Sequence, residues 1–240
     1  ASPEMGIVLQ FPSQKRDVAA LGVEQTDILV QARYLLEAIG EEGLKLTSRG
    51  NWPSEFTLHF WQKFVESYDP EYRPNRELDC IELYRLNFLL TEARIIRRRE
   101  GRMLLTKKAR EVSDSALYKD LIGAMMFEYN WAFDDQFEEH PEFQRMALDF
   151  LAWIVKGGAE PLSPVDLYHA HFESYLSLKT EIKDERLREL AEEPVFCLQT
   201  RFFDRFCVPF GLTGPGDADG LYRPTSLLME RFFPQIADKL

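Results

Sequence analysis

The segment ARIIRRREGRMLLTKKARE, residues 93–111, decides the fold of this chain. Apolar and β-branched residues at 95–96 and 103–105 flank a Glu-Gly dipeptide at 100–101, a pattern typical of a β-hairpin. Thr106 then stands where it can cap a short basic helix. We therefore expect a strongly cationic hairpin followed by a helix, which is the arrangement of a wing.

The residues before this hairpin predict three helices and one short strand. Leu78 is expected in the core, on the third of these helices. The order helix, strand, helix, helix, hairpin is that of a winged helix-turn-helix. Residues 23–113 are thus predicted to form a winged-helix domain, with residues 1–22 as an arm or a disordered lead-in. The expected elements are a helix over 26–39, a strand over 44–47, a helix starting near Pro53, and a helix over 78–92.

The rest of the chain, residues 114–240, is predicted to be a helical domain that ends in a second winged-helix-like unit. Near the end of the chain, a glycine-rich turn is again followed by a threonine and then by a helix. This succession is a weak internal repeat of the first hairpin and its helix. The fold class is therefore mainly α with small β-hairpins: a winged-helix N-terminal domain, a helical middle and a second winged-helix-like unit. The matched positions are Gly101 with Gly220, Met103 with Tyr222, and Thr106 with Thr225.

Composition and charge restrict the function classes. The formal net charge is −11. The stretch Arg94–Arg110 carries +7, so the remaining residues carry −18. Such an acidic body repels nucleic acids and anionic membranes, and only a local patch can attract them. Three scattered cysteines without a C-x-x-C pair, no apolar run of membrane length and no secretory signal favour a cytoplasmic protein without membrane contact.

Five segments of this chain carry a resemblance: LKLTSRGNWPSEF (44–56), ARIIRRREGRMLLTKKARE (93–111), FEYNWAFDD (127–135), FCLQTRFFDRFCVPFGL (196–212) and LYRPT (221–225). Together they are similar to an uncharacterised bacterial family with winged-helix-like units. Some members of that family carry a zinc-binding SEC-C tail, but this chain lacks the necessary cluster of cysteine and histidine. The resemblance implies the fold and a bacterial cytoplasmic setting. It implies no activity, catalytic residue, cofactor or metal.

The basic wing is the clearest candidate binding site. Its arginines suit phosphate recognition, because the guanidinium group offers paired donors. The alternative is a solvated hairpin whose arginines pair with the acidic body. The preceding helix has an expected polar face of Asp79, Glu82 and Arg85, with Glu77 at its start. This net acidic face is poorly suited to approaching phosphates, which counts against specific reading of DNA. The candidate nucleic-acid-binding residues are Arg97, Arg98, Arg99, Arg102, Lys107 and Lys108.

Other polar clusters have simpler explanations. Asp134, Asp135, Glu138 and Glu139 beside His140 are expected to face the N-terminus of the following helix rather than a metal.

Three further features are also predicted to be structural. His169 and His171 are too close in sequence to share one helix face. Cys197 and Cys207 are expected to be small core residues. The glycines of 211–220 match no phosphate-binding motif, and the phenylalanines at 202, 203 and 206 are assigned to the core.

Three functions follow from these observations. The leading one is a non-enzymatic protein-interaction module, regulatory in role, that binds a protein partner or itself and needs no cofactor. The alternative is a DNA- or RNA-binding regulator that uses the basic wing at Arg97–Lys108. A hydrolase built on Asp134 and Asp135 is the remote third.

Overall fold

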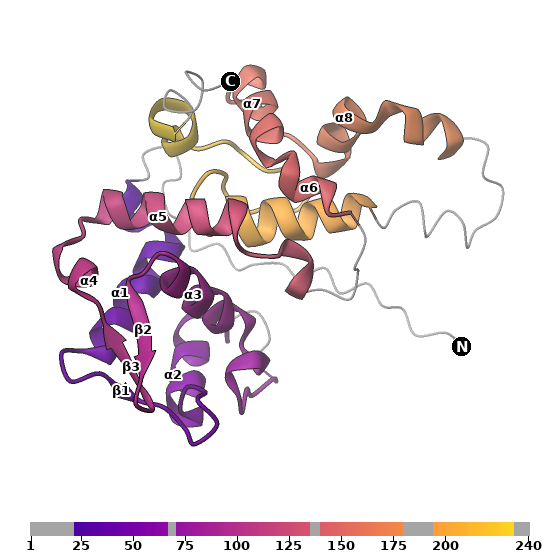
Figure 1. The fold of residues 1–240 in the computed structure, drawn as a ribbon. Helices are drawn as coiled ribbons and strands as arrows, with labels where there is room; N and C mark the ends of the chain where they lie inside the picture. The colour runs from indigo at the N-terminus through magenta and orange to yellow at the C-terminus, as the bar shows by residue number, and fades with distance from the viewer. Residues whose placement is uncertain (1–21, 67–70, 135–139, 180–193, 233–240) are drawn as a thin grey trace, which may run out of the picture.

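The computed structural model of the chain describes residues 22–66, 71–134, 140–179 and 194–232. It is mainly helical with one small antiparallel sheet (Figure 1). The predicted arm, residues 1–22, lies outside the described residues except for Gly22. The first half contains η2 (Val23–Gln25), α1 (Asp27–Ile39), β1 (Leu44–Lys45), α2 (Ser54–Phe64), η3 (Glu77–Asp79), α3 (Ile81–Glu92), β2 (Ile96–Arg99), β3 (Arg102–Leu105) and α4 (Lys107–Glu111).

The second half is almost wholly helical. Two of its helices, η5 and η6, are π-helices, and α8 has non-helical backbone angles at Phe172. Across the described ranges, no helix is long and apolar enough to cross a membrane. The elements are α5 (Asp114–Phe127), η4 (Trp131–Asp134), α6 (Glu142–Arg145), α7 (Ala147–Gly157), α8 (Pro164–Lys179), η5 (Gln199–Cys207) and η6 (Leu227–Phe232).

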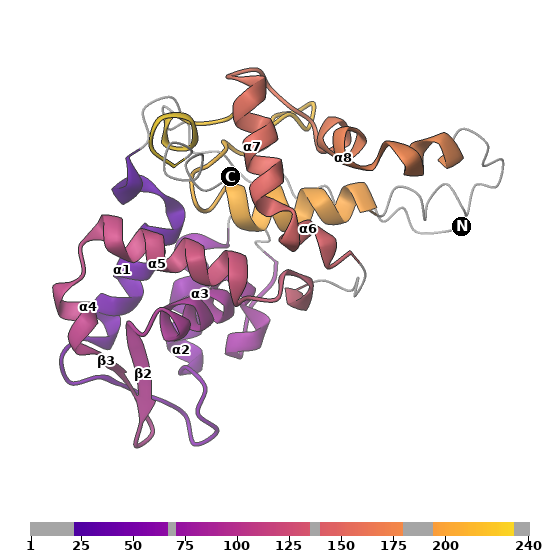
Figure 2. The same cartoon turned by 45° about the horizontal axis from the view of Figure 1, so that its top comes forward.

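The predicted hairpin is present and belongs to a three-stranded sheet of order β1-β3-β2. Its two-residue turn, Glu100-Gly101, has positive φ at both positions (52° and 70°). This geometry matches the twist of the flanking strands, and glycine adopts it without a steric penalty. Figures 1 and 2 show the hairpin projecting from one end of the molecule, with α7 near the opposite end.

The buried apolar side chains form one continuous core that runs through both halves. α5 passes between the first-half helices and the second half (Figure 2), and seven of its residues are buried. One core prediction is wrong: Leu78 lies in η3 and is 57% exposed. The helix begins only at Ile81, so Leu78 falls outside the apolar face of α3.

A set of hydrogen bonds surrounds the threonine that follows the hairpin. The Thr106 hydroxyl donates to the carbonyl of Arg94 (2.8 Å) and accepts from the amide of Ala109 (3.3 Å), which caps α4. The backbone amide of Thr106 donates to the carbonyl of Ile95 (3.0 Å). Arg94 itself has a positive φ of 58°. The threonine thus ties the end of α3, the hairpin and α4 together.

The same set recurs in the second half around Thr225. Its hydroxyl donates to the carbonyl of Gly211 (2.6 Å) and accepts from the amide of Leu228 (3.3 Å). Its backbone amide donates to the carbonyl of Leu212 (3.1 Å), and Gly211 has a positive φ of 68°. The two threonines matched in the sequence therefore hold equivalent positions in their hydrogen-bond sets.

The strand pairings recur as well, in reduced form. In place of strands, the second half has two isolated β-bridges within the described residues. Each bridge corresponds to one residue pair of the three-stranded sheet. In both halves, one partner of each pair lies two or four residues after the matched glycine, Gly101 or Gly220. The pairs Leu44–Met103 and Ile96–Leu105 of the sheet correspond to the bridges Leu162–Tyr222 and Thr213–Pro224.

Candidate functional site

The alternation of β2 divides the predicted arginine cluster between two faces of the sheet. Successive side chains of a strand point to opposite faces. Ile96 is buried, and Arg98 on the same face lies opposite the buried Met103. Arg97 and Arg99 therefore point to the outer face, where both are exposed. Only part of the predicted set can act together.

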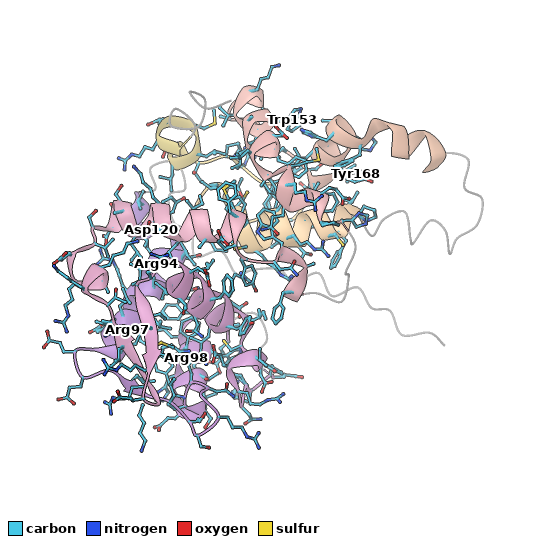
Figure 3. All side chains as sticks on the ribbon, in the orientation of Figure 1. Arg94, Arg97, Arg98, Asp120, Trp153 and Tyr168 are labelled. Carbon is cyan, nitrogen blue, oxygen red and sulfur yellow. The ribbon has the colours of Figure 1, made fainter. Side chains whose placement is uncertain are left out.

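Three cations lie side by side across the outer face. Arg102 of β3 is paired with Arg99 of β2 on one side and with Lys45 of β1 on the other. Directly opposite residues of neighbouring strands project to the same face about 5 Å apart, where like charges repel. We call Lys45, Arg97, Arg99 and Arg102 the basic sheet face (Figure 3 labels Arg97).

Among the described residues, none of these four cations forms an ion pair with a buried carboxylate. The Arg102 guanidinium is fixed by the carbonyls of Glu42 (3.0 Å) and Gly43 (2.7 Å), which leaves its charge uncompensated. Arg99 pairs with Glu100 at 3.0 Å, but both side chains are more than 60% exposed, so the pair is weak. Arg97 has no ion pair within the described part of the chain.

Arg98 has a structural role on the inner face. Its Nη2 lies 3.9 Å from Oε2 of Glu77, whose side chain is only 5% exposed. Burial raises the pKa of Glu77, while the Asn87 amide, which donates to its carboxylate at 2.6 Å, and the charge of Arg98 oppose this shift. Arg98, whose side chain is 50% exposed, thus lies beside a buried carboxylate and belongs to the inner face rather than to the basic sheet face.

The two predicted lysines of α4 are also paired. Lys108 donates to the carbonyl of Ala93 (3.0 Å) and forms a 2.8 Å ion pair with Asp120 of α5. Lys107 lies 3.8 Å from Glu111 and is 88% exposed. Lys108 therefore fastens α4 to its neighbours, whereas Lys107 stays accessible beside the sheet.

α3, which precedes the hairpin, has almost no free face. Arg85 is buried and donates to the carbonyl of Arg205 in η5 (3.4 Å). Tyr84 stacks on Phe133, and Phe88 meets Tyr129 edge to face. The prediction of an exposed polar face is wrong for Arg85, which η5 of the second half covers. Glu77, expected at the start of the helix, is also buried, but its contacts with Asn87 and Arg98 lie within the first half.

The acidic cluster at 134–140 is described by the structure only at its two ends, Asp134 and His140, and neither end belongs to a metal site. Asp135, Glu138 and Glu139 lie outside the described residues, and Asp134 ends η4. His140 contacts Glu142 through Nδ1 at 2.9 Å and stacks on Phe143. Among the described residues, no group of three or more potential metal ligands converges.

The remaining predicted positions lie in structural surroundings. His169 is exposed, whereas the His171 ring packs against Phe150 and its Nδ1 faces the carbonyl of Leu167, so the two histidines do not converge. Cys197 and Cys207 are buried and form no disulfide within the described part of the chain. All three phenylalanines of η5 are buried as well.

In the 211–220 loop, the carboxylate of Asp217 accepts hydrogen bonds from backbone amides at the end of the loop. Oδ1 of Asp217 accepts from the amides of Asp219 (3.0 Å) and Leu221 (2.9 Å). These amides are therefore not available to cradle a phosphate, in line with the missing motif.

Sequence reasoning missed Lys45. The residue lies in a two-residue strand, and nothing in its local sequence marks it as part of the basic sheet face. Only the register that places it opposite Arg102 brings it into the basic sheet face. Long-range strand register is decided by the packing of the whole unit, so a single sequence carries little signal for it.

Comparisons of the chain with protein-family models, with curated proteins and with solved structures each found no match. The resemblance to a bacterial winged-helix-like family therefore stays a prediction, and the functional argument depends on the geometry of this molecule.

Proposed function

We propose that this protein is a non-enzymatic interaction module, built from two winged-helix-like units, that holds an anionic macromolecule on its basic sheet face. The order α1-β1-α2-α3-β2-β3 and the sheet order β1-β3-β2 support a winged-helix interpretation of the first unit. The recurrent hydrogen bonds of Thr106 and Thr225 support a second, reduced unit of the same kind.

The burial of α3 decides which surface is left for binding. In a DNA-binding helix-turn-helix, the corresponding helix enters the major groove and reads base edges. Here its side chains hold the two halves of the protein together, through contacts such as that of Arg85 with the carbonyl of Arg205. This favours an interaction module over a reader of specific DNA sequence, and it leaves the exposed sheet for a partner.

The row Lys45–Arg102–Arg99 is the observation that carries the proposal. Like charges placed directly opposite one another destabilise a sheet, and here this happens twice in succession across three strands. Among the residues that the structure describes, no buried carboxylate compensates this row, in contrast to Arg98 and Glu77 on the inner face. A bound polyanion would remove the repulsion, so the cost in stability fits a binding surface.

A single substitution, Lys45→Glu, separates binding from folding. The new carboxylate would face Arg102 across the strands, so the free energy of unfolding is expected to rise by about 0.2–1 kcal/mol. Retention on immobilised heparin, a generic polyanion, is expected to fall. Urea unfolding and elution from a heparin column in a salt gradient measure the two effects on the same preparation.

The matched control is Lys156→Glu, an equal charge change on an exposed residue of α7 near the opposite end of the molecule. It should elute from heparin with the wild type. If wild-type protein passes through the column at about 50 mM salt, where electrostatic binding is strong, the proposed function is wrong. Equal losses in the two lysine variants would also contradict it, because they would reflect net charge alone.

A further inference from the structure

The chemistry of the basic sheet face identifies its partner class more narrowly. We infer that this face binds the sugar-phosphate backbone of nucleic acid, independently of base sequence. The inference rests on the proposed function and names the anionic macromolecule of that proposal. It uses the residues that point outward, and therefore differs from the set of six predicted from the sequence.

The first argument is the shape of the cation array. Arg97 and Arg99 lie two residues apart on one face of β2, a separation of about 6.6 Å along the strand. Across the strands, Arg99, Arg102 and Lys45 follow at about 4.8 Å intervals. The charges are thus spread over a surface and do not converge on one point. Such an array fits a succession of anions along a polymer better than a single small anion.

The second argument is the kind of donor. Three of the four cations are arginines, whose planar guanidinium groups bind phosphate oxygens with two parallel hydrogen bonds. The Arg102 group is already oriented by the carbonyls of Glu42 and Gly43. Less side-chain freedom is therefore lost when it meets a ligand.

The third argument distinguishes nucleic acid from an acidic protein. Protein interfaces depend on a few buried apolar or aromatic anchors, whereas interfaces with nucleic acid are polar and strongly positive. None of the three strands carries an exposed large hydrophobic side chain; Leu104, the apolar residue of the outer face, is half-buried. The large exposed apolar residues of the described chain lie elsewhere: Tyr72, Leu78, Phe127, Phe133, Val165 and Phe196.

The fourth argument concerns specificity. Base edges are read by elements that enter a groove, and contacts to phosphate carry no sequence information. α3 is covered by the second half of the chain, and its residues before Thr91 are buried or half-buried. Binding through the sheet alone therefore predicts similar affinity for unrelated sequences.

Fluorescence anisotropy with labelled duplex DNA and single-stranded RNA tests the inference. Four phosphate contacts predict a log–log salt slope of about −3.6 on the duplex and about −2.8 on the single strand. Duplex affinity should then fall about 150-fold between 50 and 200 mM salt. Arg97→Ala should reduce the duplex slope to about −2.7, while Lys156→Ala should leave it unchanged. Two duplexes of unrelated sequence should bind within about 2-fold of each other.

Each contrary outcome has a separate meaning. Heparin retention without binding to either nucleic acid would overturn this inference and leave the proposed function standing. Equal competition by polyglutamate and by duplex would overturn it in favour of an acidic protein partner. A preference of more than about 10-fold between the two duplexes would overturn the backbone-only mode. If neither heparin nor nucleic acid binds, both proposals fail together.

Discussion

The two equivalent threonines allow the repeated architecture to be tested by substitution. We consider Thr106→Val and Thr225→Val, which keep the branched shape of the side chain and remove its hydroxyl. Each change deletes a short hydrogen bond donated to a backbone carbonyl and one accepted from a helix amide. The Thr225 hydroxyl has a second, longer contact with the carbonyl of Leu212 (3.3 Å). The chemical change is the same at both positions, so any difference in stability reflects their surroundings.

The surroundings predict a large difference. Arg94 is exposed, so water can satisfy its carbonyl once the Thr106 hydroxyl is gone, and only the loss of the cap remains, about 1 kcal/mol. Gly211 and Thr225 are both buried, so the carbonyl of Gly211 would lose a 2.6 Å hydrogen bond without replacement. A buried unsatisfied carbonyl adds about 1–3 kcal/mol to the lost cap. We therefore expect about 2–4 kcal/mol for Thr225→Val.

Urea unfolding followed by far-ultraviolet circular dichroism measures both values, provided that the slope of free energy against urea stays that of the wild type. Thr225→Ser restores the hydroxyl and loses one methyl group, so it should recover at least half of the stability. The reasoning is refuted if Thr225→Val costs no more than Thr106→Val. It is also refuted if the serine variant is as unstable as the valine variant.

Three further predictions concern other parts of the fold. Burial raises the pKa of Asp204 to about 6, against a hydrogen bond from Tyr222 (2.6 Å) that opposes the shift. The Asp204 carboxyl therefore holds its proton more tightly in the folded state than in the unfolded state. The contribution of the protonated carboxyl to the free energy of unfolding is fully present below about pH 4 and is lost as the pH rises through about 6. The stability difference between wild type and Asp204→Asn should therefore change by about 1–3 kcal/mol over this window, and a flat difference would contradict the argument. Gly43→Ala should destabilise more than Gly101→Ala. Both positions have positive φ, but an added Cβ at Gly43 would lie 2.7 Å from the carbonyl oxygen of Met103, whereas one at Gly101 would meet nothing within 4 Å. Equal unfolding midpoints for the two variants would contradict this prediction. All three cysteines are buried, so Ellman's reagent should detect no thiols in the native protein and three after unfolding.

The local parts of the fold could be predicted from the sequence because short-range chemistry determines them. The Glu-Gly turn requires positive φ at two consecutive residues, and the strands on either side are apolar and β-branched, so the hairpin follows from residues 95–105 alone. The predicted cap at Thr106 is likewise local, since its hydroxyl accepts from an amide three residues later.

The errors concern residues whose environment is set by distant parts of the chain. Arg85 was expected on a polar surface, but η5 covers it. Arg98 was grouped with its neighbours, although its partner Glu77 lies 21 positions earlier. Lys45 was absent from the predicted site for the same reason, because its place depends on pairing with β3. A single sequence does not encode these contacts in any local pattern.

The two hairpin regions share their hydrogen bonds but differ in what they present. In the first, Met103 fills the core below a row of cations that points outward. In the second, Tyr222 takes the equivalent place, and its hydroxyl is bound to Asp204 within the protein. The turn beside it carries Asp217 and Asp219, whose charges would repel an anion. Binding to a polyanion should therefore be confined to the first hairpin, with the second acting as a scaffold. Arg223→Glu, next to Tyr222 and exposed, should accordingly leave heparin retention unchanged. A loss as large as that expected for Lys45→Glu would show that both hairpins contact the partner.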